Sequence, residues 1–250
     1  MKKFLIIGGD SQLAKSFSKK YPNISIPLSK RQANITEEKS LEKVFKRYSF
    51  YYVLNCAAIT DMDYAEKYPL KTFTVNGFGV YLLNKLCLKF KKKLLYISSD
   101  YAINPVNVYG FSKKMGELFV DKDFHVIRTS FYSKRTFIIN GLLNKKKIKS
   151  YSNLFFNPIS IDRLINEIYI NRDSTGTKNY FSNKKISFYR FAEVVCEIIG
   201  LNKKKYLIKA EYKNDNSTLP RKLNSYVESD INIDLKKDLL KFLKNITHEK

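Results

Sequence analysis

The chain has 250 residues, 44% of them apolar, and a formal net charge of +23 from 46 lysine and arginine residues against 23 acidic residues. That apolar content excludes intrinsic disorder and a fibrous fold, because enough surface can be buried to offset the entropy lost on folding. The lysines lie in short clusters along the whole chain, which favours a compositional bias over a dedicated nucleic-acid surface. The same positive field would attract a small anionic ligand.

The N-terminal residues resemble a signal peptide only superficially. Lys2 and Lys3 precede an apolar run that already ends at Gly8, and no later apolar stretch approaches the length that spans a bilayer. We therefore expect a soluble, cytoplasmic protein without a membrane span.

The cysteine pattern indicates neither a disulfide framework nor a zinc site. Cys56, Cys87 and Cys196 are odd in number, far apart and set among apolar neighbours, and the chain has only two histidines. We expect the cysteines to be small core residues, and we expect no metal.

Short apolar segments alternate with amphipathic segments in the first half of the chain. We predict buried strands at residues 4–7, 24–28, 52–56, 94–97 and 125–127. Between them we expect a helix capped by Thr36, with Glu37 and Glu38 in its first turn, and another over residues 79–90. The alternation predicts an α/β fold with a Rossmann-type doubly wound parallel sheet, because parallel strands need crossover helices.

The alternation loosens after about residue 130. We expect a helix over residues 161–170, another that is opened by Ser187 and closed by Gly200, and a last helix beginning near Asp234. These elements are too few and too irregular to continue the sheet. We therefore predict a sheet domain at 1–130 and a smaller C-terminal lobe at 131–250, some of whose elements pack back on the sheet domain.

The turn after the first predicted strand reads Gly8-Gly9-Asp10-Ser11-Gln12-Leu13-Ala14. A tight turn at this place lets backbone N–H groups and a helix N-terminus meet a pyrophosphate. The usual spacing of three glycines survives only as Gly8, Ser11 and Ala14. Taken alone, the motif is therefore equally consistent with an ordinary strand-to-helix turn.

Two further segments favour a dinucleotide. Ser29, Lys30 and Arg31 follow the second strand, where an NAD site commonly presents a carboxylate, so a hydroxyl and two cations predict NADPH, with NADH as the alternative cofactor. Two solvated surface charges are the other interpretation. The segment from Asn55 to Asp61 holds small alanines that allow a cofactor close to the backbone, although packing alone would also explain them.

The strongest motif is Ser98-Ser99-Asp100-Tyr101 at a strand end, followed by Tyr109 and Lys113. Residues four apart share one face of a helix, so the Lys113 ammonium can favour the phenolate of Tyr109 and lower its pKa. Ser99 can donate a hydrogen bond to the same substrate oxygen. A Tyr-x-x-x-Lys alone is common by chance, but its place after the serine strand end favours an acid–base pair.

Together these pieces resemble the extended short-chain dehydrogenases, and specifically the dTDP-4-dehydrorhamnose reductase family. The similar runs occur in family order over nearly the whole chain: 8–14, 28–36, 55–66, 75–76, 97–101, 107–117, 127–130 and 220–225. The resemblance implies an NAD(P)-binding Rossmann domain at 1–130 and a substrate-binding lobe at 131–250. It also implies hydride transfer from NADPH to C4 of a nucleotide-linked 4-keto-6-deoxy sugar, in surface polysaccharide or deoxysugar biosynthesis.

The resemblance assigns a role to each site residue. The implied catalytic residues are Ser99, Tyr109 and Lys113. The cofactor would be held by Gly8, Ser11, Gln12, Leu13, Ser29, Lys30, Arg31, Asn34, Ile35, Cys56, Ala57, Ala58, Thr60, Asn76 and Lys113. The substrate would be held by Ser99, Asp100, Tyr101, Tyr109, Phe131 and Arg221.

Three departures from the family pattern bear on these roles. The later glycines of the cofactor turn are Ser11 and Ala14, the segment from Tyr101 to Asn107 is much shorter than the family's substrate-side loop, and Phe131 stands where the family has a tryptophan. A non-catalytic dinucleotide-binding relative that regulates a partner is the alternative, against which the intact Ser99, Tyr109 and Lys113 argue. We expect a nucleotide-sugar substrate and no nucleic-acid partner, and a homodimer stays open.

Overall fold

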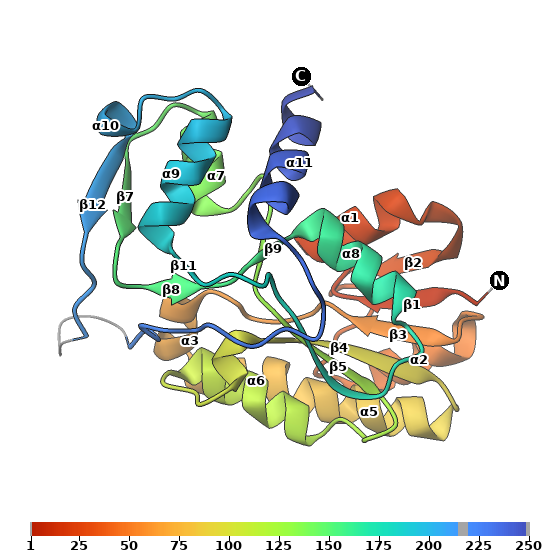
Figure 1. Cartoon of the computed structure of the whole chain (residues 1–250). Helices are drawn as coiled ribbons and strands as arrows, with labels where there is room; N and C mark the ends of the chain where they lie inside the picture. Colours follow the sequence, from red (N-terminus) through yellow and green to blue (C-terminus); the bar gives the residue numbers. More distant parts are fainter. Residues whose placement is uncertain (1, 215–219, 249–250) are drawn as a thin grey trace. The chain divides into compact units, whose positions relative to one another are not determined.

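The computed structural model describes residues 2–214 and 220–248 (Figure 1). The chain forms two compact units. The first contains the residues up to Arg128 together with Ile165–Lys178, and the second contains Thr129–Leu164 and the residues from Asn179 onward. The expected functional division at 130/131 stays a prediction, and each unit is described by itself.

A six-stranded sheet forms the centre of the first unit, with strand order β10-β5-β4-β3-β1-β2. Its strands are β1 (Phe4–Ile7), β2 (Ser25–Leu28), β3 (Tyr52–Asn55), β4 (Lys93–Ser99), β5 (His125–Thr129) and β10 (Gly176–Tyr180). β1 pairs in parallel with both β2 and β3, and β3 pairs in parallel with β4. The predicted parallel sheet is therefore confirmed, and its strand order reverses between β1 and β3, where ligands of such sheets bind.

Helices cover both faces of this sheet. They are α1 (Gln12–Lys20), η1 (Pro22–Ile24), α2 (Glu38–Arg47), α3 (Met62–Lys67), α4 (Pro69–Phe73), the π-helix η2 (Thr74–Phe78), α5 (Gly79–Lys89), η3 (Asp100–Ala102), α6 (Val108–Leu118) and α8 (Ile161–Ile170). α2 and α5 contribute Leu41 and Leu83 to one apolar core with Leu5 and Val53 of the sheet, whereas Figure 1 shows α1 and α8 on the other face. Both faces of the sheet are thus covered, which explains why β1 is continuously apolar and the first three residues of β3 are apolar and buried.

One expected helix cap is wrong. α2 begins at Glu38 with Glu37 as its N-cap, and the Thr36 hydroxyl donates instead to Asn34 Oδ1 at 3.0 Å. Thr36 is held in the turn before the helix because a neighbouring amide competes for its hydroxyl. The helix expected at 79–90 is confirmed as α5, and η2 directly before it was not expected.

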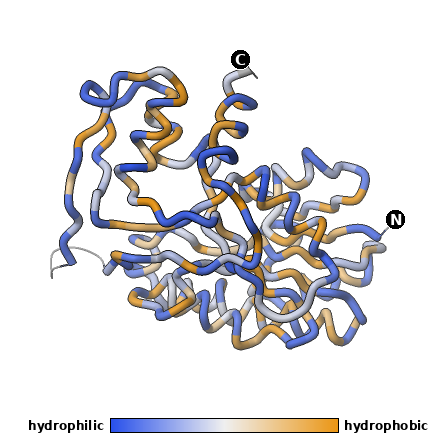
Figure 2. Tube along the Cα trace, viewed as in Figure 1, coloured by the Kyte–Doolittle hydropathy of each residue, from blue (hydrophilic) through white to orange (hydrophobic). Residues whose placement is uncertain are grey.

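The second unit is built from short elements. They are β6 (Phe131–Tyr132), α7 (Phe137–Leu143), β7 (Ile148–Tyr151), β8 (Phe155–Phe156), β9 (Ile159–Ser160), β11 (Ile186–Ser187), α9 (Phe188–Ile198), α10 (Lys203–Tyr206), β12 (Leu207–Ala210) and α11 (Leu235–His248). The strands pair as β11–β8, β12–β7 and β6–β9. Ser187 caps α9 by accepting from Arg190 N, as expected, and Figure 2 shows hydrophobic and hydrophilic residues alternating along this helix.

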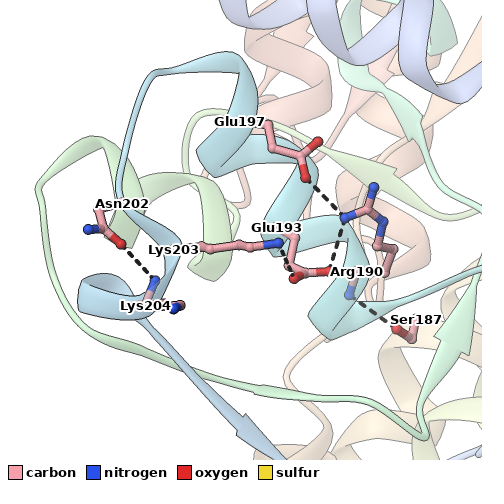
Figure 3. A network of polar contacts seen from close by, with 7 residues as sticks. All are labelled: Ser187, Arg190, Glu193, Glu197, Asn202, Lys203 and Lys204. Carbon is pink, nitrogen blue, oxygen red and sulfur yellow. Dashed lines mark hydrogen bonds and ion pairs between the residues drawn. The ribbon is translucent and has the colours of Figure 1, made fainter.

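Polar contacts join the elements of the second unit. Arg190 pairs with Glu193 and Glu197, and Lys203 of α10 pairs with Glu193 of α9 at 2.9 Å (Figure 3). These pairs are exposed at their basic ends, so each contributes little stability. The two Arg190 pairs lie within α9, and only the Lys203–Glu193 pair joins α10 to α9. Within residues 2–214 and 220–248, no helix is long and apolar enough to cross a membrane.

Candidate functional site

The turn after β1 leaves no space for a side chain. Gly8 has φ +80°, and a Cβ there would lie 2.6 Å from the backbone nitrogen of Ala57. The cause is the parallel register, which sets Ile7 beside Asn55 and so brings the two strand ends together. Glycine is required here, and this close approach, which we call the glycine cradle, lies at the switch point where dinucleotides bind in such sheets.

Ser11 replaces the second glycine of the turn without strain. It is the N-cap of α1 with φ −66°, and its hydroxyl accepts from Ala14 N at 3.2 Å. The Ser11 side chain also hydrogen-bonds the Cys56 thiol, whose pKa burial raises to about 12. The first turn of α1 contains no acidic residue, and its positive N-terminus favours an anionic ligand.

A pocket of about 720 Å³ lies at the carboxyl end of β2. It is lined by Asp10, Ser29, Lys30, Arg31, Asn34, Glu37 and Ser40. Lys30 and Arg31 thus share a cavity, as an adenosine 2′-phosphate site requires. The carboxylates of Asp10 and Glu37 were not assigned from the sequence; Asp10 stands within the quoted turn, and no sequence pattern distinguished Glu37.

Two apolar residues assigned to the cofactor have buried side chains. Leu13 is 4% exposed and Ile35 is 5% exposed. Ile35 packs beneath Gly79, where a Cβ would lie 2.9 Å from Ile35 Cγ1. Any contact of these two residues with a ligand would therefore be through the backbone or the edge of the side chain. Ala57, Ala58 and Gln12 are half-buried, and Thr60 is exposed.

Asn76 connects the loop after β3 to the helix that carries Tyr109. It lies on the π-helix, fully buried, and its amide accepts from Ile59 N at 2.8 Å and donates to Ile59 O at 2.9 Å. The same amide donates to Ser112 Oγ at 2.9 Å, and Ser112 donates to the Tyr109 carbonyl at 2.7 Å. The assigned Asn76 therefore holds the loop after β3 in place against α6. It does so from a π-helix, an element often found at functional sites.

The N-terminus of α6 is fixed from two directions. Asn107 is its N-cap and accepts from Gly110 N at 2.9 Å, while Glu66 of α3 accepts from Val108 N at 2.7 Å. Two of the helix's free N–H groups are thereby satisfied and its start is held against α3. Glu66 was part of the motif that carries the resemblance, but only the fold shows what its carboxylate touches.

Ser99 and Tyr109 meet at the carboxyl end of β4. The nearby Ser99 hydroxyl lowers the pKa of Tyr109, but burial dominates and raises that pKa well above its usual 10. Ser99 Oγ donates to Asp100 Oδ1 at 2.7 Å and accepts from Tyr101 N at 3.2 Å. Tyr101 also places its ring 6.0 Å from that of Tyr109. The assigned Ser99, Asp100, Tyr101 and Tyr109 thus form one cluster.

Lys113 lies one turn after Tyr109 and is 2% exposed. Its Nζ donates to the carbonyl of Ile97 at 2.7 Å and lies 4.3 Å from the centre of the Tyr96 ring. Burial lowers the pKa of Lys113 from 10.5 to about 7, while Glu117 and Cys56 oppose that change. The amine therefore lies against strand β4, and its charge changes close to neutral pH.

Glu117 supports this end of α6 from below. Arg128 of β5 donates to both its carboxylate oxygens, at 2.8 and 2.7 Å, and Ser98 donates to Oε1 at 2.6 Å. A bidentate pair with a further hydrogen bond satisfies the buried carboxylate and fixes α6 against two strands.

The assigned Phe131 and Arg221 belong to the second unit, and their roles stay predictions. Within the described residues, no cluster of His, Cys, Asp and Glu could hold a metal ion.

The chain is similar to known proteins along most of its length. The chain is 27% identical to the spore coat polysaccharide biosynthesis protein SpsK of Bacillus subtilis, over 80% of this chain and 81% of that protein. It is 32% identical to a dTDP-4-dehydrorhamnose reductase of Mycolicibacterium smegmatis over 42% of this chain and 37% of that protein.

The fold is shared with solved structures. A dTDP-4-dehydrorhamnose reductase of Bacillus anthracis in complex with NADP superposes with a TM-score of 0.88 at 21% identity, covering 98% of this chain and 100% of that chain. The family model of the RmlD substrate binding domain matches residues 1–147, more than half of the chain. This protein therefore belongs to the RmlD substrate binding domain family.

Proposed function

We propose that this protein is an NADPH-dependent reductase of a nucleotide-linked 4-keto-6-deoxy sugar, serving surface polysaccharide or deoxysugar biosynthesis. The observation that carries the proposal is the cluster of Ser99, Tyr109 and Lys113 at the carboxyl end of β4, next to the glycine cradle at the switch point. The relatives named above support the substrate class, and the solved structure with NADP supports the cofactor.

The residues present fit the cofactor. Gly8 lets the turn after β1 lie directly against the backbone of Cys56 and Ala57, and the N-terminus of α1, which follows this turn, offers favourable backbone N–H groups to a pyrophosphate. Lys30 and Arg31 would hold a 2′-phosphate in the pocket after β2, and Lys113 would hold the nicotinamide ribose. The bound cofactor supplies the hydride that reduces the sugar carbonyl carbon.

The chain's own residues supply the proton and stabilise the charge. Tyr109 donates its phenolic proton to the carbonyl oxygen, and Ser99 turns its hydroxyl from Asp100 to the same oxygen. The Lys113 ammonium lowers the cost of leaving Tyr109 as phenolate in a buried site. The raised pKa of Tyr109 keeps its proton in place until that charge and the substrate are present.

The test is oxidation of NADPH against a panel of nucleotide-linked 4-keto sugars. Tyr109→Phe should lower kcat by about 10²- to 10⁴-fold, the usual effect of losing a general acid, with little change in NADPH affinity. Activity within a few-fold of wild type would remove Tyr109 from its role. The non-catalytic alternative predicts NADPH binding without turnover of any member of the panel.

Cofactor choice has its own test. Lys30→Gln combined with Arg31→Gln should erase most of the preference for NADPH over NADH, because each lost charge-assisted bond to phosphate contributes about 1.5 to 3 kcal/mol. Lys39→Gln, an exposed lysine of α2 outside the pocket, is the matched control at fixed salt. An unchanged preference in the double variant would place the phosphate site elsewhere.

We also propose that the enzyme works in the cytoplasm and has no nucleic-acid partner. Its proposed substrate and cofactor are charged nucleotides that do not cross membranes unaided, so the enzyme must share their compartment. Cell fractionation tests the location, a gel shift over a salt series tests nucleic-acid binding, and light scattering tests whether the chain forms a homodimer.

A further inference from the structure

The Lys113 amine is buried with few groups to compensate for its charge. Its one hydrogen-bond acceptor among the described contacts is the Ile97 carbonyl, at 2.7 Å. A buried ammonium with a single neutral acceptor readily loses its proton, because the protein interior solvates a charge poorly. The proposed reaction nevertheless needs this amine charged, so a further group must favour the ammonium.

Tyr96 of β4 occupies the place of that group. Its side chain is fully buried, and its ring centre lies 4.3 Å from Lys113 Nζ, within the distance of a cation–π contact. The Tyr96 hydroxyl lies 3.4 Å from the carbonyls of Asn76 and Lys113, which directs the ring beneath α6. A Cβ at Gly116 would lie 2.4 Å from this hydroxyl, so the helix passes over the ring only because position 116 is glycine.

We infer that Tyr96 is a positioning residue whose ring holds the Lys113 ammonium and keeps it charged. The ring faces of aromatic side chains carry negative potential, and a cation–π contact is strongest where water is excluded, as it is around Tyr96 and Lys113. The Ile97 carbonyl and the Tyr96 ring both belong to β4, and together they hold the Lys113 amine in place. The role of this charge in catalysis rests on the proposed function; the contact itself does not.

The other groups that face Lys113 do not replace the ring. Glu117 on α6 favours the ammonium, but Arg128 and Ser98 already bond its carboxylate. Cys56, at the end of β3, acts on Lys113 only weakly and keeps its thiol proton because burial raises its pKa to about 12. Tyr109 on the same helix is neutral until it donates its proton. Removing the ring should therefore shift the equilibrium of Lys113 from the ammonium toward the neutral amine.

The direct test is the pKa of Lys113 in the protein without ligands, measured by NMR on lysine labelled in its side chain. Lys113→Met identifies the Lys113 signal by its absence. We expect Tyr96→Leu to lower the pKa of Lys113 by about one unit, and Tyr96→Phe, which keeps the ring, to leave it nearly unchanged. Equal pKa values in the Leu and Phe variants would overturn the inference and leave Tyr96 as a core residue only.

Two further variants separate charge from packing. Val80 packs in the same apolar cluster as Tyr96, so Val80→Ala opens a cavity there without removing the ring and should leave the pKa of Lys113 unchanged. If Tyr96→Leu does not fold, pentafluorophenylalanine at position 96 keeps the shape of phenylalanine but reverses the charge distribution of the ring face. It should lower the pKa of Lys113 relative to Tyr96→Phe, and no difference between the two would refute the contact.

The catalytic consequence is read from pH profiles. With a keto sugar that the wild type reduces, the alkaline limb of kcat/KM should move to lower pH by about one unit in Tyr96→Leu and stay in place in Tyr96→Phe. An unmoved limb alongside a lowered Lys113 pKa would refute the positioning role. If the wild type reduces no keto sugar, the proposed function fails, and the NMR titration still decides whether the ring holds the ammonium.

Discussion

Replacing Lys113 with methionine should make the folded protein more stable while it abolishes turnover. Lys113 is 2% exposed, and burial lowers its pKa from 10.5 to about 7. At 1.36 kcal/mol per pKa unit, that fall means that burying Lys113 lowers the free energy of unfolding by about 5 kcal/mol. Methionine has a similar length and no charge, so Lys113→Met removes this cost.

We expect a net gain of about 2 to 3 kcal/mol at pH 7, because Lys113→Met also loses the hydrogen bond to Ile97 and the contact with the Tyr96 ring. The folded pKa lies below the unfolded pKa, so the unfolded chain binds more protons between pH 7 and pH 10.5. Wild-type stability should therefore rise through this window, and the advantage of Lys113→Met should shrink as it does.

The assay is urea unfolding of both proteins, followed by circular dichroism at pH 7 and at pH 9.5 to 10. Lys43→Met, an exposed lysine of α2, controls for the general effect of removing one positive charge from a basic chain. A variant less stable than wild type at pH 7, or a stability difference that does not change with pH, would refute the view that burial lowers the pKa of Lys113 at the expense of stability.

Three more predictions follow from the site and the sheet. His125 is fully buried and its pKa is lowered from 6.5 to about 4, mainly by burial and then by Lys93, so the wild type should lose about 3 kcal/mol as pH falls through this window. Urea titrations should show a smaller loss in His125→Leu, and an equal loss would contradict this. Gly8→Ala should weaken NADPH binding and lower the Tm by several degrees, because its Cβ meets backbone atoms; an unchanged Kd would contradict the cradle. The short segment from Tyr101 to Asn107 should admit a wider range of keto-sugar nucleotides than a strict dTDP-4-dehydrorhamnose reductase, and a preference for the rhamnose precursor by several orders of magnitude in kcat/KM would contradict that.

The sequence by itself determined the sheet and the placing of the proposed catalytic pair on one helix. The strands beginning at Phe4 and at Tyr52 are apolar on both faces, which only a covered parallel sheet explains, and the strand order agrees with that reading. Tyr109 and Lys113 are four positions apart in the sequence, so helical geometry alone sets them one turn apart. Local signals of this kind need no knowledge of distant contacts. Thr36 shows their limit, since a nearby amide decided which partner its hydroxyl took.

Only the tertiary structure decided what surrounds these groups. Tyr96 reads as one more apolar strand residue, yet the crossing of α6 over β4 places its ring against the Lys113 amine. Glu66 is 42 residues from Val108 in the chain, and the docking of α3 on α6 makes it a helix cap. Asn76 is likewise joined to Ser112 across 36 residues. Such contacts depend on how elements pack, and sequence periodicity contains no information about which side chains of two packed elements will touch.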